Sequence, residues 1–188
     1  MKSLEIEPLK LPGVLLIKNK VNPDIRGFFF KPYAREELIK RNIDFSVAEV
    51  FYSISKKNVI RGMHFQLPPS EQAKIVTVIS GKITDVVLDI RKGSPYYGRW
   101  ISIFLEANDG KALYIPRGFA HGFISRNGQS TVLYLANCKY SSESEAGVKY
   151  DSFGFDWETD GPILSNRDLN FKPIDSFQSP FIFVEDES

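Results

Sequence analysis

Residues 59–66 read Val59-Ile60-Arg61-Gly62-Met63-His64-Phe65-Gln66, an apolar, strand-like stretch that carries an arginine, a histidine and a glutamine. Successive side chains of an extended strand point to opposite faces. We therefore expect two faces, one with Arg61, Met63 and Phe65 and the other with Gly62, His64 and Gln66. A single histidine is more often a hydrogen-bonded or surface residue than a catalytic one, so the rest of the chain has to decide its role.

Short apolar runs separated by turn signals fill most of the chain on both sides of this stretch. Turn signals such as Asn108-Asp109-Gly110 and Asn127-Gly128 lie between them. The only convincing helix is Ala34–Arg41, short and mostly polar, with acidic residues early and basic residues late. Many short strands with almost no helix predict an all-β protein, an antiparallel sandwich or barrel of the jelly-roll kind with one or a few short peripheral helices. The expected strands are 14–17, 27–30, 45–55, 59–66, 75–79, 83–90, 100–105, 112–115, 119–125 and 131–136.

The length and the pattern indicate one domain. At 188 residues the chain can fill a single core, and we expect one domain over 1–188, with its core at about 10–170 and a C-terminal tail at 171–188. The aromatic residues of the last forty positions lack a clear period. We expect them to pack on the outside of the sheets or against a partner subunit.

Composition excludes several classes of function. The net charge of +1, from 24 basic and 23 acidic residues, gives no field that would attract nucleic acid or an anionic membrane. The single cysteine, Cys138, cannot form an internal disulfide, which favours a reducing compartment. With no secretion signal and no apolar run of membrane length, the expectation is a cytoplasmic protein.

The histidines limit the chemistry. The chain has only two, His64 and His121, and no His-x-His pair, so we do not expect a metal site. The alternative is metal-free proton transfer beside a sugar carbonyl, which needs a base, a group that stabilises the enolate and an acid on the opposite face. His64 fits the base, Lys74 or His121 the enolate stabiliser and a tyrosine such as Tyr134 the acid. Spacing alone does not select this set.

An ordered set of motifs along the chain says more about function than the spacing of single residues does. From about residue 10 to residue 168 the chain closely resembles the dTDP-4-dehydrorhamnose 3,5-epimerase family. The motifs that carry this resemblance are Arg26-Gly27-Phe28-Phe29-Phe30, Arg61-Gly62-Met63-His64-Phe65-Gln66, Gln72-Ala73-Lys74, the run from Asp85 to Pro95, Ile115-Pro116-Arg117-Gly118-Phe119-Ala120-His121-Gly122-Phe123 and Leu133-Tyr134.

The resemblance implies a cupin-type jelly roll, usually a homodimer, that binds a nucleotide-diphosphate sugar and uses neither a metal nor an organic cofactor. It implies that His64 is the base, that Asp168 orients and polarises it, that Tyr134 is the acid on the opposite face and that Lys74 lies near the developing enolate. A carboxylate on the far ring nitrogen fixes the tautomer and strengthens the base. Substrate-binding positions implied in the same way are Arg26, beside the diphosphate, with Arg61, Gln66, His121 and Glu145.

The chain departs from the family where the nucleotide base would bind. Lys31 stands where the family commonly has a glutamate that accepts the imide hydrogen of thymine, and a lysine only donates. Glu49 and Phe51 also replace the usual residues of the strand before His64. We therefore carry the hypothesis of a GDP-linked substrate, such as the 4-keto heptoses of capsular polysaccharides, because guanine offers acceptors to a lysine.

The leading prediction is an isomerase that epimerises a nucleotide-linked 4-keto sugar at C3, C5 or both, for surface polysaccharide synthesis. Two alternatives stay open. A 3,4-ketoisomerase on the same scaffold would return a 3-keto product, and the match at Tyr134 argues against it. A non-catalytic jelly roll that only binds sugar nucleotides would require the matches at His64, Tyr134 and Asp168 to be accidental.

Overall fold

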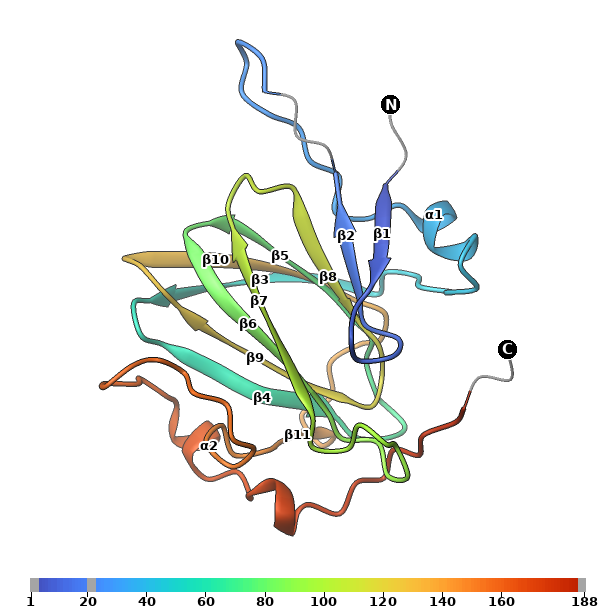
Figure 1. Cartoon of the computed structure of the whole chain (residues 1–188), viewed down its shortest axis with the longest axis vertical. Helices are drawn as coiled ribbons and strands as arrows, with labels where there is room; N and C mark the ends of the chain where they lie inside the picture. Colours follow the sequence, from blue (N-terminus) through green and yellow to red (C-terminus); the bar gives the residue numbers. More distant parts are fainter. Residues whose placement is uncertain (1–3, 20–22, 186–188) are drawn as a thin grey trace.

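The computed structural model describes residues 4–19 and 23–185, so the outermost positions of the predicted domain 1–188 lie outside the described residues. Two antiparallel sheets pack face to face (Figure 1). The six-stranded sheet has the order β1 (Glu5–Pro8), β2 (Leu15–Lys18), β8 (Lys111–Ile115), β5 (Lys74–Ser80), β10 (Gln129–Ala136), β3 (Glu49–Lys56). The five-stranded sheet has the order β11 (Glu145–Gly147), β4 (Ile60–Gln66), β9 (Phe119–Ser125), β6 (Lys82–Asp89), β7 (Trp100–Glu106).

Helical structure among the described residues is limited to three short segments, α1 (Arg35–Ile39), α2 (Asn166–Leu169) and the 3-10 turn η1 (Ile174–Ser176). The predicted all-β jelly roll with short peripheral helices is confirmed. In the described part of the chain, no helix has the length and apolar character needed to cross a membrane.

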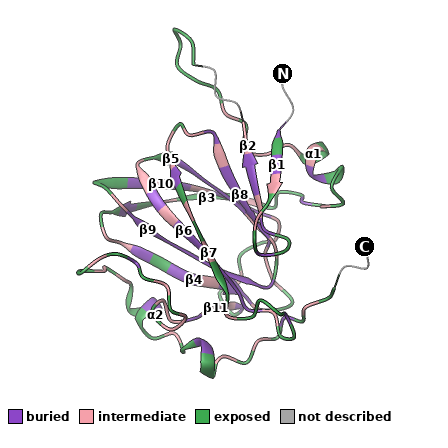
Figure 2. Ribbon diagram, in the orientation of Figure 1, coloured by how far each residue is buried: buried purple, intermediate pink, exposed green. Residues whose placement is uncertain are grey.

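The main core lies between the sheets, because strands β5 to β10 turn alternate apolar side chains inward. The six-stranded sheet contributes residues such as Val76, Leu113 and Val132, and the five-stranded sheet contributes Val87 and Phe123. Figure 2 shows these facing surfaces as buried. Burial of this kind is the main favourable contribution to folding.

Each sheet is also covered in part on its outer face. The C-terminal segment lays Trp157, Ile174 and Phe181 over the five-stranded sheet, where they pack with residues such as Met63. The expectation that the late aromatics pack on the outside of a sheet is thereby met. On the six-stranded sheet, Leu38 of α1 packs with other buried residues such as Phe45 and Tyr114, and this covers one end of the face.

The structure differs from the predicted elements at several places: the strand predicted at 45–55 begins only at Glu49, and the helix predicted at 34–41 covers Arg35–Ile39. Residues 28–30 do not form a strand, and Phe28 and Phe29 are exposed, because this segment has no strand to pair with. The strands β1 and β11 were not predicted. β11 reads Glu145-Ala146-Gly147, which has no apolar alternation, and it is a strand because it pairs with β4 in register.

The predicted division of residues 61–66 into two alternating faces is wrong at its first half. Arg61 lies opposite Phe123 and His64 opposite His121, so three steps along β4 match two steps along β9. The extra residue is a β-bulge, which reverses the alternation locally and puts Arg61 on the same face as His64. Beyond the bulge, His64 and Gln66 share a face as expected.

Candidate active site

A pocket of about 230 Å3 opens between the two sheets. It brings together most of the predicted site residues, which come from β3, β4, β5, β9, β10 and β11. The lining residues are Phe51, Ser53, Arg61, His64, Phe65, Gln66, Gln72, Lys74, His121, Phe123, Tyr134, Tyr140, Glu145 and Arg167.

His64 and Asp168 form a hydrogen-bonded pair at this pocket. His64 Nε2 lies 2.9 Å from Asp168 Oδ1, and the His64 side chain is about a quarter exposed whereas the Asp168 side chain is 3% exposed. Burial lowers the pKa of His64, and the Asp168 carboxylate opposes this shift by its hydrogen bond and its charge. Burial would raise the pKa of Asp168, but hydrogen bonds from His64 and from the Gly62 N–H hold it at about 2.

The position of Asp168 has a local cause. Ser165 caps α2, and its hydroxyl accepts a hydrogen bond of 3.1 Å from the Asp168 N–H. Asp168 Oδ2 accepts a second bond, 3.2 Å long, from the N–H of Gly62 in the bulge of β4. The carboxylate is therefore attached both to the helix and to the strand that carries His64.

Tyr134 enters the pocket from β10, on the sheet opposite to His64. Its ring stacks on Phe51 with 4.9 Å between centroids and 12° between planes. Burial raises the pKa of the Tyr134 phenol well above its usual range, so the hydroxyl keeps its proton at neutral pH.

Two further groups of the predicted set lie deep in the pocket. Lys74 begins β5, and burial lowers its pKa to about 8. His121 on β9 is buried, and its Nε2 lies 2.8 Å from Asp85 Oδ2. Asp85 itself is fully buried, and its Oδ1 has no hydrogen-bond partner among the described residues. The pocket thus holds a second histidine–aspartate pair.

The side chains of Arg61 and Gln66, two of the predicted binding residues, already make hydrogen bonds within the protein. The Arg61 Nε donates to Ser55 Oγ at 2.9 Å and its Nη2 to the Ile54 carbonyl at 3.0 Å. Both ends of the Gln66 amide are engaged by backbone groups of neighbouring loops. Gln66 therefore connects two loops that border the pocket.

Glu49 and Glu145 both contact Tyr140, a residue of the pocket lining. Glu49 does not line the pocket, and its carboxylate accepts a 3.1 Å bond from the Tyr140 N–H. Glu145 does line it and accepts from the Tyr140 hydroxyl at 3.0 Å.

Arg26 and Lys31 are not brought to this pocket. Both belong to a loop that projects beyond the sheets (Figure 1), and neither lines the pocket. Arg26 is mostly exposed and pairs with Asp24 of the same loop. Phe28 of this loop lies beside the outer face of the six-stranded sheet, near Ile79 and Leu133.

Sequence reasoning missed Asp85 and Arg167. Asp85 interrupts an otherwise apolar strand, which was a signal for a buried polar partner. Arg167 lines the pocket and donates from Nε to Asp168 Oδ1 at 3.2 Å. Its signal was only its position next to Asp168.

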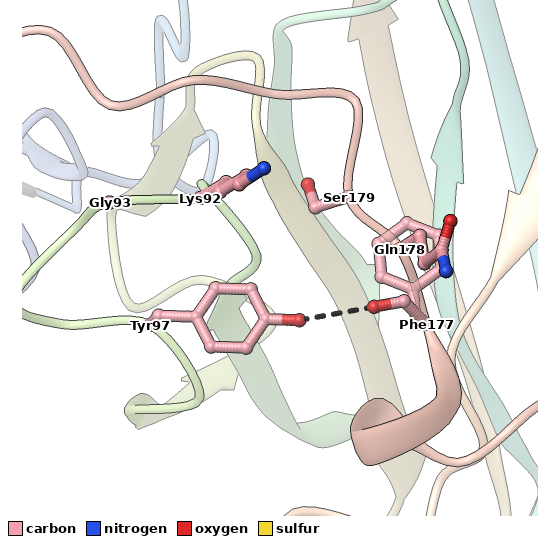
Figure 3. A pocket seen from close by; sticks show the side chains of 6 residues that line it. All are labelled: Lys92, Gly93, Tyr97, Phe177, Gln178 and Ser179. Atoms are coloured by element: carbon pink, nitrogen blue, oxygen red, sulfur yellow. Dashed lines mark hydrogen bonds between the residues drawn. The ribbon is translucent and has the colours of Figure 1, made fainter.

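A larger surface cavity of about 820 Å3 lies elsewhere, between the β6–β7 loop and the C-terminal segment (Figure 3). Tyr97 borders it and donates a hydrogen bond to the Phe177 carbonyl at 3.4 Å. None of the predicted site residues lines this cavity. Within residues 4–19 and 23–185, histidine, cysteine and carboxylate side chains do not gather in groups of three or more that would hold a metal ion.

Comparisons with known proteins identify the family of the chain. A family profile described as dTDP-4-dehydrorhamnose 3,5-epimerase matches residues 8–176. The chain is 41% identical over 164 residues to the enzyme of that name from Salmonella typhimurium, covering 84% of this chain and 88% of the relative. It is 37% identical over 166 residues to the one from Shigella flexneri, covering 86% and 91%.

Solved structures give the same result for the fold. The dTDP-6-deoxy-D-glucose-3,5-epimerase of Legionella pneumophila, in complex with dTDP-4-keto-L-rhamnose, superposes with a TM-score of 0.88 at 29% identity and covers 94% of this chain and 95% of that one. A 3'-monoepimerase from Streptomyces bikiniensis, in complex with dTDP-quinovose, superposes with a TM-score of 0.85 at 31% identity and covers 89% and 87%.

Proposed function

The chain belongs to the dTDP-4-dehydrorhamnose 3,5-epimerase family of cupin-type nucleotide-sugar epimerases, and we propose that it inverts a nucleotide-linked 4-keto sugar by proton transfer between His64 and Tyr134. The observation that carries this proposal is the placement of the two groups. His64 lies on β4 of one sheet and Tyr134 on β10 of the other, and both line the pocket between the sheets. A sugar ring in that pocket meets a base on one face and an acid on the other.

The proposed reaction needs three steps at each carbon. His64 removes the proton from the carbon beside the keto group, and the electron pair moves to the carbonyl oxygen to give an enolate. Lys74, with its pKa of about 8, is mostly cationic at neutral pH and stabilises that oxygen, with His121 beside it. Tyr134 then protonates the carbon from the opposite face, and solvent restores both groups to their starting states.

Deuterium exchange tests this proposal. With a 4-keto substrate in D2O, we expect deuterium at C3, at C5 or at both, followed by NMR. The His64→Asn variant should lose about a hundredfold or more of this exchange, because a positioned general base contributes that much. No exchange at either carbon with the wild-type protein would refute the proposal, and a 3-keto product would identify a 3,4-ketoisomerase instead.

The number of inverted centres is part of the same experiment. The names of similar proteins include both a 3,5-epimerase and a 3'-monoepimerase. We propose inversion at both C3 and C5, which predicts deuterium at both carbons of the product. Deuterium at C3 alone would identify a monoepimerase.

The nucleotide is a separate proposal. The relatives and solved structures are named for dTDP-linked sugars, whereas Lys31 cannot accept the imide hydrogen of thymine. We propose that the base is read differently here, with guanine as the first candidate. Turnover of GDP-linked and dTDP-linked 4-keto sugars should be compared, and a strong preference for dTDP would remove the guanine hypothesis.

We also propose a homodimer. The outer face of the six-stranded sheet carries an apolar strip, Val50, Tyr52, Ile54 and Ile79, whose side chains are each at least half exposed. A second copy packed on this strip would bury it. The loop with Arg26 and Lys31 lies at the same outer face, as the position of Phe28 beside Ile79 indicates. In such a dimer this loop is placed to reach the partner's pocket, where Arg26 would meet the diphosphate.

The cellular role follows from the product class. We propose that the inverted sugar is made in the cytoplasm and is used for surface polysaccharide synthesis. Deleting the gene should remove that sugar from the hydrolysed surface polysaccharide, and an unchanged sugar composition would contradict this role.

A further inference from the structure

Arg167 is a charged pocket residue to which the proposed chemistry assigns no step. Its guanidinium lies between two carboxylates and the base: Nη1 donates to Glu145 Oε1, Nε donates to Asp168 Oδ1 at 3.2 Å, and Nη2 lies 3.2 Å from His64 Nε2. We propose that Arg167 is a positioning residue that keeps the His64 imidazole neutral in the free enzyme, ready to accept a proton. This inference rests on the proposed role of His64 as the base.

The tautomer of His64 follows from its partners. A carboxylate with a pKa of about 2 is ionised at neutral pH and can only accept, so His64 donates through Nε2 to Asp168. The lone pair is then on Nδ1, which is the basic nitrogen. Because Nε2 already carries a hydrogen, its contact with Arg167 Nη2 is no hydrogen bond. Two donor groups face each other, and a second proton on the ring would place two cations side by side.

The opposing influence is Asp168. A buried carboxylate beside an imidazole stabilises the imidazolium, and an imidazolium cannot act as a base. Arg167 shares the same oxygen, Asp168 Oδ1, with His64. It therefore neutralises part of the negative charge that would otherwise hold a proton on the ring. Asp168 can orient His64 without trapping it in the charged form.

Contacts with two different elements hold the Arg167 guanidinium beside His64. Glu145 belongs to β11, which pairs with β4 so that Gly147 lies opposite His64. Arg167 and Asp168 are consecutive residues of α2. On another side the His64 ring meets the edge of Phe171, with 5.8 Å between centroids and 74° between planes. The imidazole and the guanidinium are thus fixed against each other by a strand, a helix and an aromatic ring.

Other charged groups around His64 act in the same direction or are already paired. Burial is the main cause that lowers the pKa of His64, Asp168 opposes it, and the charges of Arg167 and Lys74 lower it further. Glu145 is paired with Arg167, and His121 is paired with Asp85. Arg61 of β4, Tyr134 of β10 and Tyr140 are the remaining titratable groups that line the pocket, and the Tyr140 hydroxyl donates to Glu145. Among the described residues, Arg167 is the cation with a recorded contact to the ring, 3.2 Å from Nη2 to Nε2.

The imidazole titration can be measured without substrate. The chain has only two histidines, so the ring signals of a histidine-labelled sample give two titration curves by NMR, and the His64→Asn variant assigns them. In Arg167→Gln we expect the midpoint of His64 to move upward, since the imidazolium loses its cationic neighbour and gains an unshared carboxylate. The acid limb of kcat/KM against pH should move upward by the same amount, because that profile reports the free enzyme.

Matched variants separate charge from shape. Arg167→Lys keeps the positive charge and loses the planar guanidinium. In this variant the titration midpoint of His64 should stay near that of the wild type. Arg35→Gln removes a cation that pairs with Asp44 on the exposed surface of α1, and it should leave the midpoint unchanged. Should Arg167→Gln fail to fold, Arg167→Met is a second neutral replacement that keeps the aliphatic stem.

Two outcomes would overturn the inference: a His64 midpoint that does not rise in the neutral variants, or an equal rise in Arg167→Lys. The result is distinguishable from a failure of the proposed function. If the wild-type protein shows no exchange in D2O, the assignment of His64 as the base fails, whereas the substrate-free titration still measures whether Arg167 controls the charge of the ring.

Discussion

At the scale of single residues, the site depends on which groups hold their protons. Tyr134 keeps its proton because its phenol is buried, Lys74 is mostly cationic at neutral pH with a pKa of about 8, and Asp168 is ionised. The groups proposed as acid, electrostatic stabiliser and orienting carboxylate therefore all start in the state that the reaction needs. Their different environments, and not their residue types alone, produce this arrangement.

Removing the phenol hydroxyl should separate proton removal from inversion. In Tyr134→Phe we expect the epimerised product to fall by about a hundredfold, since the acid on one face is lost. His64 can still remove a proton and return solvent deuterium to the same face, so the recovered substrate should become deuterated without inversion. NMR of the recovered substrate and of the product measures both effects.

Tyr97→Phe is the matched control for this prediction, because Tyr97 does not line the pocket and its hydroxyl bonds the Phe177 carbonyl. It should epimerise at the wild-type rate. Full epimerisation by Tyr134→Phe would show that another group supplies the proton.

The lowered pKa of Asp168 predicts how the free energy of unfolding changes at acid pH. Its pKa in the folded protein is lowered to about 2, so the unfolded chain binds the proton first as the pH falls. The stabilisation is fully present above the unfolded value near pH 4 and is lost as the pH falls from there to about 2. The Asp168 carboxylate should contribute about 2 kcal/mol of this pH-dependent free energy of unfolding.

Denaturant unfolding of the wild type and of Asp168→Asn at several pH values checks this prediction. The difference in free energy between the two proteins should shrink as the pH falls from 4 to 2. A difference that stays constant over that range would mean that Asp168 has an ordinary pKa.

At the scale of secondary-structure elements, the bulge of β4 is the feature that assembles the site. It turns Arg61 to the face of His64 and presents the Gly62 N–H to Asp168. The two strands come very close here: a Cβ on Gly62 would lie 2.5 Å from the Cα of Gly122, and Gly62 has a φ of +147°. Only glycine at both positions allows this approach.

Gly62→Ala should therefore cost about 3 kcal/mol of stability, from overpacking and from the strained backbone. Epimerase activity should fall as well, since the shift displaces both Arg61 and His64. Thermal unfolding and the exchange assay measure the two effects.

Gly161→Ala is the control for the bulge. Nothing lies within 4 Å of the added Cβ, and no unusual φ is required there. Its stability should stay within about 0.5 kcal/mol of the wild type. If Gly62→Ala behaves like Gly161→Ala, the close contact at the bulge does not constrain the strand.

The bulge also explains what the sequence could and could not predict. Strands β4 to β10 were predicted within one or two residues at most ends, because their alternating apolar side chains form the core between the sheets. The strict alternation failed at Gly62-Met63, because one extra residue in a strand leaves no trace in its apolar pattern. The triple phenylalanine was predicted as a strand, yet residues 28–30 are not in a strand of either sheet.

At the scale of the whole molecule, the site combines residues that are far apart in sequence. His64 and Asp168 are 104 positions apart, and His121 and Asp85 are 36 apart. No spacing rule would have selected these pairs. The resemblance to a family supplied His64, Asp168 and Tyr134, whereas the contacts in the structure identify the partners of Asp85 and Arg167.

A prediction for the whole molecule concerns the proposed homodimer. Tyr52 is the most exposed member of the apolar strip on the outer face of the six-stranded sheet, at 64%. Tyr52→Glu should convert the proposed dimer to a monomer, because a carboxylate buried at an apolar interface without a partner is costly. Sedimentation velocity measures the mass of both proteins.

Ile163→Asp provides the comparison, because Ile163 is similarly exposed but lies beside β4 on the other sheet. It should leave the mass unchanged. A wild-type protein that sediments as a monomer would contradict the proposed dimer.

The position of Asp168 on α2, after the last strand of either sheet, has a consequence for the newly made protein. Translation proceeds from the amino terminus, so every strand leaves the ribosome before this carboxylate does. A nascent chain can thus enclose the pocket while His64 still lacks the carboxylate that selects its tautomer. The proposed base is oriented only after every described strand of both sheets has been synthesised.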